Sequence, residues 1–142
     1  MASEFRMVHR VEFADTDAAG IAHFARYLRY MEVTEHAFFR SIGFSIFTAE
    51  THRVGWPRVH ASCDYSAPLR FEDEVEVHLR VKEKKEKALT YEFEFRRVKP
   101  APAVDVARGV MVVVCVSRDE KGRMKSVPIP ADIASKIEAF KP

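Results

Sequence analysis

The chain has 142 residues, the usual size of one domain, with 47% hydrophobic and 31% charged residues. This balance is typical of a globular protein with its own core and argues against a disordered or fibrous chain. The 23 Lys and Arg residues nearly offset the 21 Asp and Glu residues, so the net charge of +2 gives no reason to expect a nucleic-acid partner. We expect one domain over residues 1–142.

The N-terminus and the cysteines indicate where in the cell the protein is expected. The first ten residues contain charged side chains and lack the apolar run of a signal peptide, and the longest apolar run, residues 110–116, is too short to span a bilayer. Cys63 and Cys115 lie in separate strand-like runs, which favours reduced core thiols over a disulfide or a zinc site. These features predict a cytoplasmic protein with no membrane partner and no metal.

Hydrophobic periodicity predicts the first elements. Alternating apolar and polar residues over 5–13 indicate a half-buried strand, and residues 15–20 favour a turn and the start of a helix. Apolar residues spaced by three, four or seven then predict a long helix that ends at Gly43, and residues 44–53 are expected to form a short helix or a loop. The apolar positions of the helix are Ile21, Phe24, Leu28, Met31, Phe38 and Ile42.

The second half of the chain reads mainly as strands. The order is one strand, one long helix, four strands and one short helix, which favours an α+β architecture with an antiparallel sheet wrapped around or packed on the long helix. The continuous apolar run at 110–116 suggests a central strand covered on both faces. The predicted strands span 58–66, 75–82, 89–98 and 104–117, with turns at 83–88 and 119–122 and a last helix over 131–140.

Several common catalytic motifs are absent from the sequence. It contains no P-loop, no G-x-G-x-x-G, no G-x-S-x-G and no H-E-x-x-H. A more informative feature is the predicted junction between strand and helix, where Asp15 and Asp17 precede the free N–H groups of the helix. A carboxylate and backbone donors that face one carbonyl group can attack it, or activate water, while stabilising the oxyanion. The simpler alternative is that these aspartates only cap the helix.

The same junction carries a family resemblance. Residues 13–32, FADTDAAGIAHFARYLRYME, closely resemble the signature of the 4-hydroxybenzoyl-CoA thioesterase-like family of hotdog-fold acyl-CoA thioesterases. The element order and the PIPAD sequence at 128–132 agree with it. The resemblance implies that Asp17 is the catalytic carboxylate, that Asp15 braces the turn, and that the backbone N–H of Phe24 binds the thioester oxygen.

Two helix glutamates are also candidates, because a sister branch of hotdog thioesterases uses a glutamate on the helix. Glu35 interrupts the apolar face, and we expect it either to be partly buried with a partner or to reach solvent at an edge. Glu32 matches an acidic position of the signature and is expected to support the site without contacting substrate.

The resemblance also implies an acyl-CoA substrate. Candidate contacts for it include Gly20 of the motif and His23, which adjoins the expected oxyanion donor and whose alternative is a passive pocket-lining or solvent-facing position. Tyr27 and Trp56 are candidate walls of the acyl pocket, although a large aromatic is more often a core residue. For the CoA phosphates the candidate contacts are Lys84, Lys85, Lys87, Arg123 and Lys125, whose alternative is a solvated charged surface.

The overall hypothesis is a hotdog-fold acyl-CoA thioesterase without a cofactor, assembled as a homodimer or homotetramer with the site between subunits. Thiolates are good leaving groups, so one carboxylate and a helix start could suffice. Acyl carrier protein is an alternative carrier of the thioester. Two alternatives keep the fold: an enoyl-thioester hydratase and a non-catalytic acyl-thioester binding protein.

Overall fold

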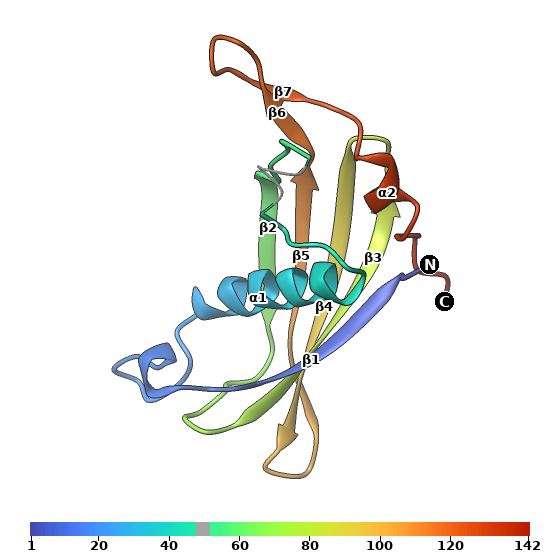
Figure 1. The fold of residues 1–142 in the computed structure, drawn as a ribbon. Helices are drawn as coiled ribbons and strands as arrows, with labels where there is room; N and C mark the ends of the chain where they lie inside the picture. The colour runs from blue at the N-terminus through green and yellow to red at the C-terminus, as the bar shows by residue number, and fades with distance from the viewer. Residues whose placement is uncertain (48–51) are drawn as a thin grey trace.

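The structure is a computed structural model that describes residues 1–47 and 52–142. It consists of a curved antiparallel sheet with one long helix packed on one face, followed by a small hairpin and a short helix (Figure 1). The elements are β1 (Glu4–Arg10), the 3-10 turn η1 (Phe13–Asp15), α1 (Arg26–Ser41), β2 (Arg58–Tyr65), β3 (Glu74–Lys84), β4 (Ala88–Lys99), β5 (Val104–Val114), β6 (Val116–Arg118), β7 (Met124–Ser126) and α2 (Ala131–Ala134).

The main sheet has the strand order β1-β3-β4-β5-β2, with every neighbouring pair antiparallel. Its two edges are therefore β1 and β2. The turn η1 and the start of α1 lie near one end of the sheet, whereas the β3–β4 hairpin, the β6–β7 hairpin and α2 lie at the opposite end (Figure 1). The expected α+β class, with an antiparallel sheet against one long helix, is confirmed.

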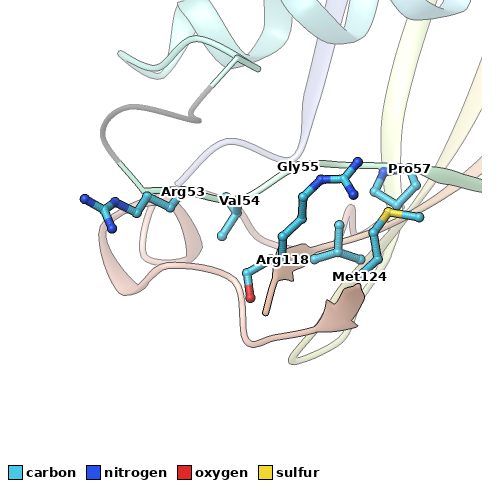
Figure 2. A pocket seen from close by; sticks show the side chains of 8 residues that line it. Arg53, Val54, Gly55, Pro57, Arg118 and Met124 are labelled. Atoms are coloured by element: carbon cyan, nitrogen blue, oxygen red, sulfur yellow. The ribbon is translucent and has the colours of Figure 1, made fainter. Parts of the chain in front are cut away.

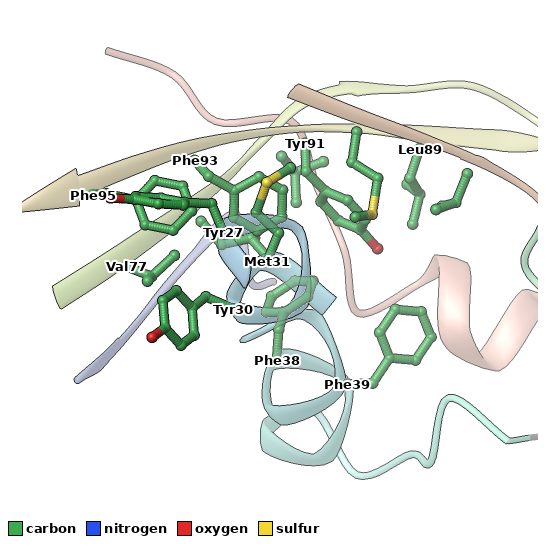
Figure 3. Packing of buried hydrophobic residues seen from close by; sticks show 14 of the residues in the cluster. Tyr27, Tyr30, Met31, Phe38, Phe39, Val77, Leu89, Tyr91, Phe93 and Phe95 are labelled. Atoms are coloured by element: carbon green, nitrogen blue, oxygen red, sulfur yellow. The ribbon is translucent and has the colours of Figure 1, made fainter. Parts of the chain in front are cut away.

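The core lies between α1 and the concave face of the sheet. Alternate residues of β3 and β4 point toward the helix, as the strand period of two requires, and pack against its aromatic side chains (Figure 3). Gly109 on β5 permits close approach of the helix, because a Cβ there would come within 2.7 Å of the Met31 sulfur. The helix contributes Tyr27, Tyr30, Met31, Phe38 and Phe39, and the strands contribute Val75, Val77, Leu79, Val81, Leu89, Tyr91, Phe93 and Phe95.

The helix begins later than predicted. The predicted apolar stripe starts at Ile21, but α1 begins at Arg26, and Phe24 and Leu28 are 67% and 36% exposed. The intervening residues form an irregular turn closed by a bridge between Thr16 and Ala22. The predicted end is confirmed, because the chain leaves the helix at a Gly43 with a φ of +94°.

The first strand and the last helix are shorter than predicted. β1 ends at Arg10, and Phe13 lies in η1 with 76% of its surface exposed, so its expected burial was wrong. α2 ends at Ala134 because the following residues pair with other segments: the Glu138 N–H donates to the Ala2 carbonyl, and the Phe140 N–H donates to the Val81 carbonyl. A backbone bonded to neighbouring chain segments cannot also continue the helical ladder.

The strands predicted at 58–66, 75–82 and 89–98 agree with β2, β3 and β4 within two residues at each end. The strand predicted at 104–117 divides into β5 and β6, and β5 lies beside the edge strand β2 instead of at the centre. Its outer side chains, among them Val110 and Val112, are therefore only half-buried. The polar turn at 119–122 joins β6 to β7, a hairpin the sequence pattern missed.

Of the segment 44–53, residues 44–47 form no helix, and residues 48–51 lie outside the described residues. No helix within the described parts of the chain is long and apolar enough to cross a membrane. Cys63 and Cys115 are free thiols.

Candidate active site

Asp15 anchors the turn between β1 and α1. Its carboxylate is buried and accepts hydrogen bonds from the Tyr30 hydroxyl at 2.8 Å and from the Glu12 N–H at 2.9 Å. Its backbone carbonyl accepts a third hydrogen bond from the His23 N–H at 2.7 Å. The Arg26 guanidinium lies 3.9 Å from the other carboxylate oxygen. These contacts fit the bracing role expected for Asp15, because they close the turn on itself and join it to α1.

A buried polar chain continues from this anchor into the helix. The Thr34 hydroxyl donates to the Tyr30 carbonyl at 2.7 Å, so it must accept the 2.9 Å hydrogen bond from His9 Nε2 on β1. Burial lowers the pKa of His9 to about 4, and the nearby Arg29 acts in the same direction. Burial and the hydrogen bond to Asp15 raise the pKa of Tyr30. At neutral pH both rings are therefore uncharged, and His9 carries its proton on Nε2.

Asp17 lies in the tight turn that follows. Its Oδ1 accepts a hydrogen bond from the Ala19 N–H at 2.9 Å, and its backbone bonds to Ile21 and Gly20. Gly20 has a φ of +79°, a conformation that disfavours side chains with a Cβ. Gly20 therefore shapes the turn that presents Asp17, a half-buried carboxylate with one oxygen free of these bonds.

The segment leading into α1 is fixed at almost every polar group. The His23 carbonyl accepts from the Arg26 N–H at 2.9 Å, and His23 Nδ1 accepts from the Ala25 N–H at 3.1 Å. The Tyr65 hydroxyl, at the end of β2, donates to the Phe24 carbonyl at 2.7 Å. The Phe24 N–H is the exception, because it has no hydrogen-bond partner among residues 1–47 and 52–142. A fixed and unpaired N–H at a helix start is a donor available to an oxyanion.

Asp17 and Phe24 line one cavity of about 500 Å³. Its walls are mainly apolar, and Asp17 is the only carboxylate among the described residues that line it. The Tyr27 and Tyr65 rings meet edge to face, 4.9 Å apart, and burial raises the pKa of each to about 12, so both hydroxyls stay protonated at neutral pH. The remaining lining residues are Ile21, Ala22, Ser66, Ala67 and Pro68.

The other acyl-site candidates divide into two groups. His23 adjoins the cavity through Phe24, on which its ring stacks at 4.4 Å, and Tyr27 lines it. Trp56 lies in the core, 7% exposed and edge to face with Phe39 at 5.4 Å, and it does not line the Asp17 cavity of this chain.

The predicted phosphate-binding residues lie in or next to the β3–β4 and β6–β7 hairpins, at the opposite end of the sheet from η1 (Figure 1). The Lys84 ammonium donates to the carbonyls of Ala134 and Ile137, so it stabilises the end of α2. Lys85 and Lys87 are exposed at the β3–β4 hairpin. Arg123 and Lys125 belong to the β6–β7 hairpin, where Arg123 forms an ion pair with Asp119 at 2.9 Å.

A second cavity, of about 480 Å³, lies at the same end, beside the start of β2. Figure 2 shows Arg53, Pro57, Arg118 and Met124 around it. No group of three or more His, Cys, Asp or Glu side chains in the described residues is arranged to hold a metal ion.

Glu35 and Glu32 take different positions on α1. Glu35 is completely buried and is paired with Arg58 of β2, which corresponds to the first of the two expectations for it. Glu32 is exposed and lies 3.8 Å from the same guanidinium. Neither glutamate lines the Asp17 cavity.

Sequence reasoning missed Tyr30 and Tyr65 at this site. Tyr30 lies on the helix and Tyr65 ends a strand, and each hydroxyl reaches a backbone or carboxylate group far along the chain. No local pattern marks such contacts, since they depend on how β2 and α1 pack.

Comparison with known proteins assigns the family. Residues 11–137 match the model of the Thioesterase-like superfamily, and the chain belongs to this family. The fold is similar to that of 4-hydroxybenzoyl-CoA thioesterase from Pseudomonas sp., with a TM-score of 0.86, 22% identity and coverage of 94% of this chain and 99% of that one. The expected hotdog fold is thereby confirmed.

Curated relatives agree with this family. The Pseudomonas 4-hydroxybenzoyl-CoA thioesterase is 24% identical over 93% of this chain and 96% of its own length. A 1,4-dihydroxy-2-naphthoyl-CoA hydrolase from Synechococcus elongatus is 30% identical over 52% of this chain, and the matched segment spans only 56% of that protein. A solved variant of the 4-hydroxybenzoyl-CoA thioesterase, with aspartate replaced by asparagine, is complexed with 4-hydroxybenzoyl-CoA and superposes with a TM-score of 0.85 at 22% identity.

Proposed function

We propose that this protein hydrolyses an acyl-CoA thioester to a carboxylic acid and free CoA. The observation that carries the proposal concerns one apolar cavity. Among the described residues, this cavity is lined by Asp17, its only carboxylate, and by Phe24, whose N–H is unpaired. The names of these two relatives support the same reaction class, because they are hydrolases of aromatic acyl-CoA thioesters.

In the proposed reaction, the thioester carbonyl lies in this cavity with its oxygen toward the Phe24 N–H. Asp17 either removes a proton from the attacking water or attacks the carbonyl itself, in which case water then hydrolyses the mixed anhydride. In both routes a C–O bond forms at the carbonyl carbon, negative charge develops on the oxygen, and the C–S bond breaks to release the CoA thiolate. The N–H and the positive end of α1 stabilise that charge.

We also propose that two copies pair along β2. Within residues 1–47 and 52–142, no strand pairs with the outer side of this edge strand, and Val59 on it is 63% exposed. Antiparallel pairing of two β2 strands would place the start of one beside the end of the other. The cavity shown in Figure 2 and the β3–β4 and β6–β7 hairpins of the second copy would then lie toward the Asp17 cavity of the first copy. This arrangement explains how residues distant from Asp17 within one chain can bind the phosphates of the same substrate.

The test of hydrolysis is thiol release from a panel of aromatic and aliphatic acyl-CoA esters by wild type and Asp17→Asn. Asparagine can still accept the hydrogen bond from Ala19, so folding should be nearly unchanged while kcat falls by about two orders of magnitude or more. Equal rates for the two proteins would overturn the role of Asp17. Binding without any thiol release would favour an acyl-thioester binding protein or an enoyl-thioester hydratase, which an enoyl-CoA hydration assay separates.

The test of pairing is the molar mass in solution, measured by light scattering. Val59→Glu places a carboxylate on the proposed contact strand of both copies, so it should produce monomers and lower activity. A wild-type protein that is monomeric at assay concentration would contradict the pairing without contradicting hydrolysis.

A further inference from the structure

Tyr65 connects the edge strand β2 to the start of α1. It is the last residue of β2, and its hydroxyl donates to the Phe24 carbonyl at 2.7 Å, across 41 positions of sequence. The ring is 47% exposed and packs edge to face on Tyr27. The hydroxyl also interacts with the half-buried Cys63 thiol, but the hydrogen bond that it donates acts on one short segment of backbone.

That segment has no regular structure to hold it. Phe24 and Ala25 precede the first residue of α1. The peptide before Phe24 consists of the His23 carbonyl and the Phe24 N–H. It is held by the hydrogen bond from the Arg26 N–H to the His23 carbonyl. The peptide after Phe24 is fixed on its N–H side by His23 Nδ1 and on its carbonyl side by Tyr65. Without Tyr65, the carbonyl side of the second peptide loses its hydrogen bond and the backbone torsions of Phe24 gain freedom.

We propose that Tyr65 is a positioning residue that fixes the direction of the Phe24 N–H toward the thioester oxygen. The proposal rests on the proposed hydrolysis, and it adds a residue that the sequence motif does not include. An oxyanion donor stabilises the transition state only when it is already aimed at the developing charge, so a small loss of alignment lowers kcat more than it changes substrate binding.

The experiment compares Tyr65→Phe with wild type in two measurements. Steady-state kinetics on the best acyl-CoA substrate should show kcat lowered about 10- to 100-fold with little change in KM. The ¹³C resonance of the Phe24 carbonyl should shift, because this atom loses a hydrogen bond. Tyr91→Phe is the control, since it removes a core hydroxyl that faces Glu35 and does not line the Asp17 cavity, and it should leave kcat unchanged.

The outcomes separate this proposal from the proposed function. If Tyr65→Phe keeps the wild-type kcat while Asp17→Asn is inactive, the positioning role is overturned and hydrolysis stands. An unshifted Phe24 carbonyl resonance would overturn it independently of any activity. If Tyr65→Phe raises only KM, Tyr65 is a wall of the cavity and the proposal is wrong. Wild type that releases no thiol overturns hydrolysis, and the positioning role with it.

Discussion

The carboxylate of Glu35 on α1 is completely buried, and the guanidinium of Arg58 on the edge strand β2 forms an ion pair with it. Arg58 also donates to the Trp56 carbonyl at 2.9 Å and is 25% exposed. The pair therefore connects the middle of the helix to the start of the strand whose other end carries Tyr65. A buried ion pair gives little net stability, but loss of one partner leaves an uncompensated charge in the core.

Replacement of Arg58 by methionine tests this relationship. With the Glu35 carboxylate left unpaired, the free energy of unfolding at neutral pH should fall by about 3 kcal/mol. The double variant Glu35→Gln/Arg58→Met removes both charges and should recover part of that loss. Urea unfolding of the two variants and of wild type measures the effect. A single variant as stable as wild type would show that solvent screens the pair.

The same carboxylate should make stability depend on pH. Burial raises the pKa of Glu35 from its ordinary value of 4.5, against the opposing effect of Arg58. Between the ordinary pKa of the unfolded state and the raised pKa of the folded state, the folded state binds more protons. The free energy of unfolding therefore decreases as pH rises through this window. Glu35→Gln should remove this contribution to the pH dependence of stability. Its unfolding free energy, measured from pH 4 to pH 8, is compared with wild type, and parallel curves would contradict the raised pKa.

His9 should produce a pH dependence of opposite sign. Its pKa is lowered to about 4 in the folded state, so between about 6.5 and 4 the unfolded state binds the proton and stability decreases as pH falls. His9→Gln keeps a donor for the Thr34 hydroxyl and cannot titrate. The variant should therefore lose stability less steeply than wild type below pH 6.5. An ordinary His9 pKa in an NMR titration would contradict this prediction directly.

The sequence predicted the strands and the position of the turn that carries Asp17 better than the helix face. The motif places Asp17 correctly at the junction because its turn chemistry is local. The apolar period failed at Ile21 and Phe24, since these apolar residues line the cavity instead of the core. Conversely, Glu35 interrupts the apolar pattern yet is fully buried, because Arg58 compensates its charge from a strand more than twenty residues away. Partners of this kind arise only when the sheet closes on the helix, and a periodicity argument cannot include them.

The basic residues at the far end of the sheet provide the last prediction, which separates two roles within one hairpin. Lys84 holds the carbonyls that end α2, so Lys84→Met should lower the free energy of unfolding by about 1 kcal/mol and leave KM unchanged. Lys85 and Lys87 are exposed, and the double variant Lys85→Ala/Lys87→Ala should raise KM for an acyl-CoA about tenfold with unchanged stability. The control substrate is the same acyl group on N-acetylcysteamine, which has no phosphates and should show no change. If KM rises equally for both substrates, or rises in Lys84→Met as much as in the double variant, the assignment of phosphate binding to Lys85 and Lys87 is wrong.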